Sequence, residues 1–153
     1  MAVHHLARDQ SVDLPQAQVF DFFAAAENLA RITPAGLGFE FLEPPPEHLE
    51  VGAEVRYRIH LNGVPVSWTS RIAEWDPPHG FADIQVKGPY HRWTHTHMFD
   101  ADGESRTIIR DRVEYEVPLG PLGEVARLLF VDRQLKAIFD FRARAVSQAL
   151  GGD

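Results

Sequence analysis

Apolar and polar residues alternate along most of the middle of the chain. Val55, Tyr57 and Ile59 are separated by arginines, the two-residue period of a strand with one buried face. Asn62-Gly63 closes this segment and is among the strongest signals for a two-residue hairpin turn. The same pattern, bounded by turn residues, predicts seven strands, at residues 3–14, 39–42, 55–61, 64–75, 81–87, 92–99 and 105–117.

Apolar residues at helical spacing occur in two other places. Near the amino terminus, Pro15 suits the first turn of a helix over residues 16–26, and a short helix over residues 29–32 ends before Pro34. After the last strand, residues 122–150 predict one long helix. Its expected apolar stripe is formed by Val125, Leu128, Val131, Leu135, Ile138, Phe139, Ala145, Val146 and Ala149.

The order of these elements predicts the fold class. A strand, two short helices, about six antiparallel strands and a long helix indicate an α+β fold, in which the long helix covers one face of the sheet. The chain of 153 residues is an ordinary size for one domain, so we expect a single domain over residues 1–153.

Composition excludes several classes of function. The net charge of −7 disfavours nucleic acids and anionic membranes as partners, because both attract basic surfaces. The chain has no cysteine, which rules out disulfides, thiolate nucleophiles and thiolate metal sites. No apolar run is long enough to span a membrane and no secretory signal is visible, so we expect a cytoplasmic protein.

Residues 81–99 carry an unusual set of side chains on one face of a predicted hairpin. Because strand side chains alternate between faces, the two strands present one shared row if their faces coincide. Buried polar groups need partners, so this row suits a pocket wall better than a packed core. The row contains Phe81, Asp83, Gln85, Trp93, His95, His97 and Phe99.

Two further segments add candidate polar groups. In the strand over residues 105–117, Asp111 and Tyr115 share a face and could lie beside the row. In the long helix, Arg142 falls on the apolar stripe, seven residues after Leu135. We expect its long side chain to reach the solvent at the rim; the alternative is that it enters the cavity mouth and meets a ligand carboxylate or an acid.

Several local phrases carry a resemblance to a known family. They include Pro15 to Phe23 (PQAQVFDFF), Trp75-Asp76-Pro77-Pro78, Gly88-Pro89-Tyr90, Trp93-Thr94-His95-Thr96-His97 and Asp111-Arg112-Val113-Glu114-Tyr115. Over nearly its whole length the chain resembles the SRPBCC superfamily (START-related, pollen-allergen-like), in particular its stand-alone polyketide cyclase/dehydrase-like members.

This resemblance implies a helix-grip fold, a curved antiparallel sheet of about six or seven strands wrapped around the long carboxy-terminal helix. It also implies a cavity between them for a small hydrophobic or aromatic molecule. Members of the superfamily include lipid and steroid carriers, hormone receptors, aromatic polyketide cyclases and co-chaperone-like proteins. The residues expected to contact a ligand are Trp68, Asp83, Gln85, Trp93, His95, His97, Phe99, Asp111, Tyr115, Leu135, Phe139 and Arg142.

The polar row allows three chemical interpretations. His95 and His97, with Asp83 or Asp111, could bind zinc or iron, but histidines hydrogen-bonded to nearby acids are the simpler expectation, and we predict no metal and no cofactor. An Asp–His pair could act as a general base in a cyclase-like reaction, with His95, His97, Asp83 and Asp111 as catalytic candidates. Binding without turnover is the favoured hypothesis.

Two questions stay open at this stage. A protein-interaction module of co-chaperone or toxin type is a third class of function, which a closed cavity and a patch-free surface would oppose. The oligomeric state, monomer or homodimer, does not follow from the sequence.

Overall fold

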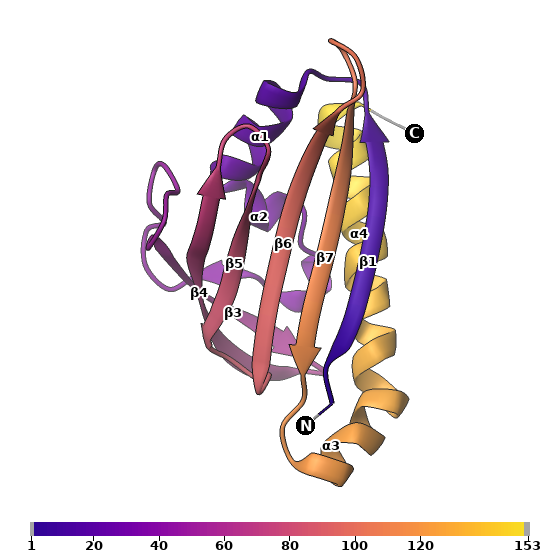
Figure 1. Ribbon diagram of the computed structural model, residues 1–153. Coiled ribbons are helices and arrows are strands. Elements are labelled where there is room, and N and C mark those ends of the chain that lie inside the picture. Colours follow the sequence, from indigo (N-terminus) through magenta and orange to yellow (C-terminus); the bar gives the residue numbers. More distant parts are fainter. Residues whose placement is uncertain (1, 152–153) are drawn as a thin grey trace.

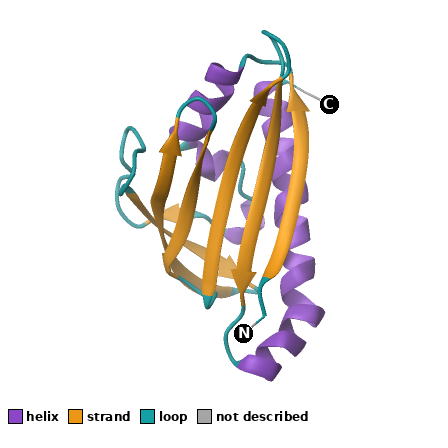
Figure 2. Ribbon diagram, in the orientation of Figure 1, coloured by secondary structure: helices purple, strands orange, loops and turns teal. Residues whose placement is uncertain are grey.

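The computed structural model describes residues 2–151, which form one antiparallel sheet and a set of helices on one side of it (Figures 1 and 2). The strands lie in the order β1-β7-β6-β5-β4-β3-β2. They are β1 (His4–Val12), β2 (Glu40–Phe41), β3 (Glu54–Leu61), β4 (Val64–Asp76), β5 (Gly80–Lys87), β6 (Arg92–Ala101) and β7 (Thr107–Glu116). The predicted α+β helix-grip architecture with seven strands is therefore confirmed.

The helices also follow the predicted order. Two short α-helices and a 3₁₀ turn follow β1, and α1 and α2 lie on the same side of the sheet as the carboxy-terminal helix (Figure 1). The long carboxy-terminal helix then runs along the sheet. The bounds are α1 (Gln16–Ala24), α2 (Asn28–Arg31), η1 (Ala35–Leu37), α3 (Gly120–Ala126), the π-helical turn η2 (Arg127–Val131) and α4 (Asp132–Leu150).

The curvature of the sheet has local causes in β3 and β4. Asn62 and Gly63 both have positive φ, +52° and +79°, as expected of the two-residue turn that joins these strands tightly. The pairing of β4 with β5 shifts register between Thr69 and Ser70 and again between Ile72 and Glu74. Such irregularities bend a strand and increase its twist, so the β2–β5 half of the sheet curls around the helices (Figure 2).

Two apolar clusters fill the space between sheet and helices. One gathers around α1, where the Phe20 ring packs edge-on against Phe81 and Phe99, with ring centroids 6.1 and 5.8 Å apart. The other includes Leu135 and Phe139 of α4, packed over the middle of the sheet. Between these clusters the structure leaves room for a cavity.

The carboxy-terminal helix departs from the expected pattern in its first third. Val125 and Leu128, placed by periodicity on the buried stripe, are 55% and 68% exposed. The reason is that α3 and η2 extend beyond the end of the sheet, which leaves no surface to cover them (Figure 1). The exposed apolar residues of this segment, here called the apolar tip, are Leu119, Leu122, Val125, Leu128, Leu129 and Phe130. None of the helices in the described part of the chain is long and apolar enough to cross a membrane.

Candidate functional site

A cavity of about 190 Å³ lies between the curved sheet, α2, η1 and α4. Its walls are mainly aliphatic and aromatic, with polar side chains gathered on β5, β6 and α4. An apolar cavity of about 150 Å³ accommodates benzene, so this one has room for a molecule of one or two rings. Among the residues predicted to contact a ligand, the lining includes Trp68, Asp83, Trp93, His95, His97, Leu135, Phe139 and Arg142.

Aromatic rings form one wall of the cavity. Tyr57 stacks on Phe39 and on Trp68, with ring centroids 4.8 and 6.1 Å apart. Trp93 then meets Trp68 edge to face at 5.3 Å. Tyr57 and Trp68 are cross-strand partners on β3 and β4, so the strand register sets their stacking. Flat faces in this arrangement suit a planar ligand.

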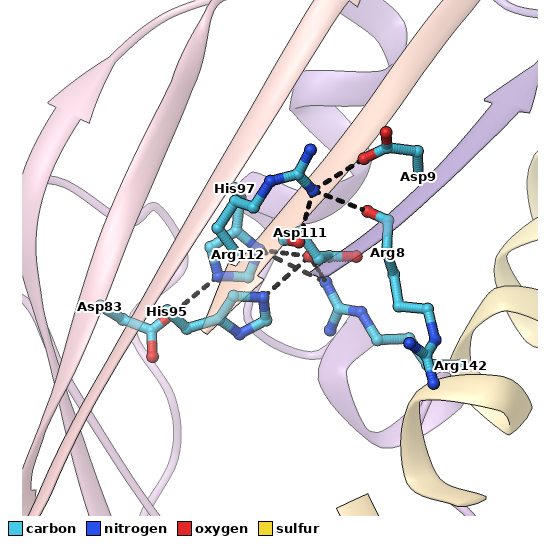
Figure 3. A network of polar contacts seen from close by, with 8 residues as sticks. All are labelled: Arg8, Asp9, Asp83, His95, His97, Asp111, Arg112 and Arg142. Carbon is cyan, nitrogen blue, oxygen red and sulfur yellow. Dashed lines mark hydrogen bonds and ion pairs between the residues drawn. The ribbon is translucent and has the colours of Figure 1, made fainter. Parts of the chain in front are cut away.

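The polar end of the cavity is built by the predicted hairpin and by β7. Asp83 pairs with His95 across β5 and β6, and His97 pairs with Asp111 across β6 and β7. The hydrogen bonds run diagonally: His97 Nε2 donates to Asp83 Oδ2 at 2.7 Å, and His95 Nε2 donates to Asp111 Oδ1 at 2.8 Å (Figure 3). The two imidazoles stack with centroids 3.7 Å apart.

Arg142 completes this cluster, which corrects the expectation that it reaches the rim. The residue is 8% exposed, and Nη2 donates to Asp111 Oδ1 at 3.2 Å and to His97 Nδ1 at 3.3 Å (Figure 3). The guanidinium also lies over the rings of Phe23 and Phe139, 5.3 and 5.8 Å from their centroids. The alternative interpretation, in which Arg142 meets one of the acids, is the one observed.

These contacts fix the protons on both imidazoles. A guanidinium can only donate, so His97 Nδ1 accepts from Arg142 and the ring proton is on Nε2, facing Asp83. Burial lowers the pKa of His97 to about 4, so the ring is neutral near pH 7. For His95, the carboxylate of Asp111 accepts from Nε2–H, and in this tautomer the ring lone pair is on Nδ1.

Both acids at the polar end are ionised. Burial alone would raise the pKa of Asp111, but the charge of Arg142 and the hydrogen bond from His95 hold it well below its usual range. Burial likewise opposes ionisation of Asp83, and the hydrogen bond from His97 lowers its pKa nonetheless. The polar end therefore contains two carboxylates and one guanidinium.

Asp83, His95 and His97 are also close enough to be considered as metal ligands, since one potential ligand atom of each lies within 4.8 Å of the others. Their geometry favours the hydrogen-bonded interpretation. The two rings are nearly parallel, 25° apart, so their in-plane lone pairs run side by side and do not converge on one point. Both nitrogens of His97 are already engaged, one of them by the cation Arg142.

Four of the predicted ligand contacts lie outside the cavity lining, each for a visible reason. The Gln85 amide closes the hairpin by bonding the backbone N–H and C=O of Tyr90. Phe99 is 1% exposed and belongs to the cluster around α1. Asp111 lies behind His95 and Arg142, and the Tyr115 hydroxyl donates to Asp132 at 2.6 Å.

Sequence reasoning also missed parts of the lining. The cavity is also lined by Ile32, which directly follows α2, by Leu37 of the turn η1 and by Tyr90 of the hairpin turn. Their types, aliphatic and aromatic, are those of ordinary core residues, so no sequence signal separates them. Tyr57 is the exception, because its place on the inner face of β3 follows from alternation.

Similar folds occur in solved structures. The Zhui aromatase/cyclase from Streptomyces sp. R1128 matches with a TM-score of 0.70 and 20% identity, over 99% of this chain and 100% of that one. Truncated norcoclaurine synthase from Thalictrum flavum matches with a TM-score of 0.70 and 14% identity, over 99% and 96%. A protein from Thermus thermophilus, TTHA0849, matches with 0.68 and 18%, over 95% and 99%. Comparison with curated proteins gives no match.

The curved sheet, the helix that it grips and the cavity between them are those of a helix-grip protein, and the family match places the chain in the SRPBCC superfamily, as the resemblance implied. More specifically, the model of the family "Polyketide cyclase / dehydrase and lipid transport" matches residues 12–141. The chain belongs to this family.

Proposed function

We propose that this protein binds a small aromatic or otherwise apolar molecule inside the cavity. The observation that supports this is the asymmetry of the lining, which has an aromatic wall of Tyr57, Trp68 and Trp93 and one ionised polar end. Pockets for small molecules have this character, with a few convergent polar groups that orient an otherwise apolar ligand. The family relationship is consistent with either carriage or turnover of such a ligand.

A blocked cavity tests the proposal. Ile138 of α4 lines the cavity, whereas its neighbour Ala137 is exposed. Native mass spectrometry of the purified protein is expected to detect a retained small molecule in the wild type and in Ala137→Trp. Ile138→Trp, whose indole would fill the space, is expected to lose it. Equal retention by both variants, with both folded by circular dichroism, would place the ligand elsewhere.

A second candidate function is acid–base catalysis in the same cavity, as in an aromatic polyketide cyclase. The observation in its favour is the His95–Asp111 pair, because Asp111 accepts from Nε2–H and so orients a ring whose Nδ1 lone pair can take a proton. His97 is the weaker candidate, since both of its ring nitrogens are engaged. Turnover of an aromatic ketone panel that His95→Gln abolishes and His97→Gln retains would support this function. Absence of turnover across the panel would contradict it.

A further inference from the structure

The polar end of the cavity has hydrogen-bond acceptors without partners. Asp83 uses Oδ2 for His97, and His95 uses Nε2 for Asp111; Oδ1 and Nδ1 have no partner among residues 2–151. In the same part of the chain, Trp68 Nε1 is the one fully enclosed polar side-chain atom that lacks a partner. Oδ1 and Nδ1 are therefore not enclosed by protein, and both side chains line the cavity, so the two acceptors are open to its interior.

The two acceptors are carried by neighbouring side chains. Asp83 and His95 are directly paired across β5 and β6, which places their side chains next to one another on the inner face. His95 is 6% exposed, so its free nitrogen has little access to bulk water. A ligand group that donates hydrogen bonds at this place would satisfy both atoms, whereas a group with only acceptors would leave them unsatisfied.

The charge at the polar end also favours a neutral hydrogen-bond donor over a ligand carboxylate. The charge of Arg142 is matched by Asp111 at 3.2 Å, whereas Asp83 is an ionised carboxylate whose hydrogen-bond partner, His97, is neutral near pH 7. A ligand carboxylate brought to this end would have to be desolvated next to another carboxylate, which is costly in an apolar cavity. The structure thus disfavours the arrangement in which Arg142 binds a ligand carboxylate.

We propose that the ligand is a neutral aromatic hydroxy compound of one or two rings, held by hydrogen bonds from its hydroxyl groups to Asp83 Oδ1 and His95 Nδ1. This inference rests on the proposed function, because it requires a ligand in the cavity. It goes further by naming the ligand class and by predicting that the corresponding carboxylic acids are rejected.

Three two-ring probes of similar size test the ligand class: 2-naphthol, naphthalene and 2-naphthoate. Trp68 and Trp93 line the cavity, so quenching of tryptophan fluorescence reports binding to refolded wild-type protein at pH 7. We expect 2-naphthol to bind roughly tenfold more tightly than naphthalene, the usual effect of one hydrogen bond to a charged group, and 2-naphthoate to bind most weakly. Tighter binding of 2-naphthoate than of 2-naphthol would overturn the inference.

Variants of the acceptors separate this inference from the proposed function. Asp83→Asn and His95→Phe are expected to remove most of the preference for 2-naphthol over naphthalene, whereas Asp21→Asn, at an exposed position of α1, is expected to keep it. Equal affinity of the wild type for 2-naphthol and naphthalene would contradict the inference and leave the proposed function standing. Failure of all three probes to bind the wild type would contradict both. If a variant does not fold, the relative affinities of the wild type for the three probes still test the inference.

Discussion

Arg142 is the residue that allows the sheet to bury Asp111. It is 8% exposed and donates to a carboxylate that is itself 5% exposed. We expect Arg142→Met to lower the free energy of unfolding by about 3–5 kcal/mol, because it leaves a buried charge without its partner. Urea denaturation at pH 7 measures this difference.

Two variants control for the loss of the long side chain itself. Arg144→Met, two residues further along α4 and exposed, is expected to stay within about 0.5 kcal/mol of the wild type. The double variant Asp111→Asn/Arg142→Met is expected to recover part of the loss, since it also removes the carboxylate that Arg142→Met leaves without its cation. If the double variant were less stable than Arg142→Met alone, charge compensation would not be the main role of Arg142.

His97 makes stability depend on pH. Burial lowers its pKa to about 4, whereas the same ring in the unfolded chain titrates near 6.5. Between these pH values the unfolded chain binds more protons, so the free energy of unfolding falls as the pH decreases from about 6.5 to about 4. The loss from this ring amounts to at most roughly 3 kcal/mol, at 1.36 kcal/mol per pH unit. Chemical denaturation as a function of pH measures the slope.

His97→Gln tests this assignment because it retains a side-chain donor near Asp83 and removes the titration. We expect the variant to flatten the pH dependence between pH 6.5 and 4, while His91→Gln, at an exposed position, leaves it unchanged. Asp83 and Asp111, whose pKa values are lowered, contribute separately: their stabilisation is lost below about pH 4. An unchanged slope in His97→Gln would assign the proton uptake to another group.

For individual residues, the sequence allows us to predict which side chains lie on the inner face of the sheet, because the alternation of strand side chains is enough to assign the face. Alternation places Asp83, His95 and His97 on one surface, and the register of the hairpin confirms their proximity. The choice of partners could not be predicted. Arg142 is 45 residues from His97 along the chain, and only the packing of α4 on the sheet brings them together.

At the scale of elements, the carboxy-terminal helix shows that residues with the same helical spacing can differ in burial. Leu128 and Leu135 are seven residues apart and belong to the same predicted stripe, yet one is 68% exposed and the other 4%. We expect Leu135→Ala to lower the free energy of unfolding by about 2–5 kcal/mol, the usual cost of a cavity in a core. Leu128→Ala is expected to change it by less than about 0.5 kcal/mol. Thermal or urea unfolding of the two matched variants measures the contrast, and similar losses would indicate that the apolar tip is covered in solution.

The same contrast shows what a helical pattern can and cannot establish. The spacing of apolar residues correctly predicts that residues up to Leu150 are helical, because backbone hydrogen bonding within a helix is local. Whether a stripe is buried depends on what lies opposite it. The sheet ends before α3 and η2, so the pattern overstates the buried part of the helix (Figure 1).

At the scale of the whole molecule, strand order and curvature follow from local signals such as Asn62-Gly63 and the short loops between antiparallel strands. The presence of the cavity does not follow from such local signals. Its existence depends on how far the sheet curls away from α4, and the volume is the small remainder after the side chains of both layers have packed. Residues such as Ile32 and Tyr90 line it by position and not by any special type.

One consequence concerns mechanical force. β1 begins at His4 near one end of the long axis, and α4 ends near the opposite end, where Gly151 accepts a hydrogen bond from the Asp13 amide (Figure 1). β1 is joined to β7 by a continuous antiparallel register from His4 to Val12. A pull on the two ends therefore acts along this ladder, loading its hydrogen bonds together in shear. Strands loaded in shear resist extension far better than strands whose hydrogen bonds break one at a time. The fold is therefore expected to resist a force applied between its two ends better than a force that peels its strands apart.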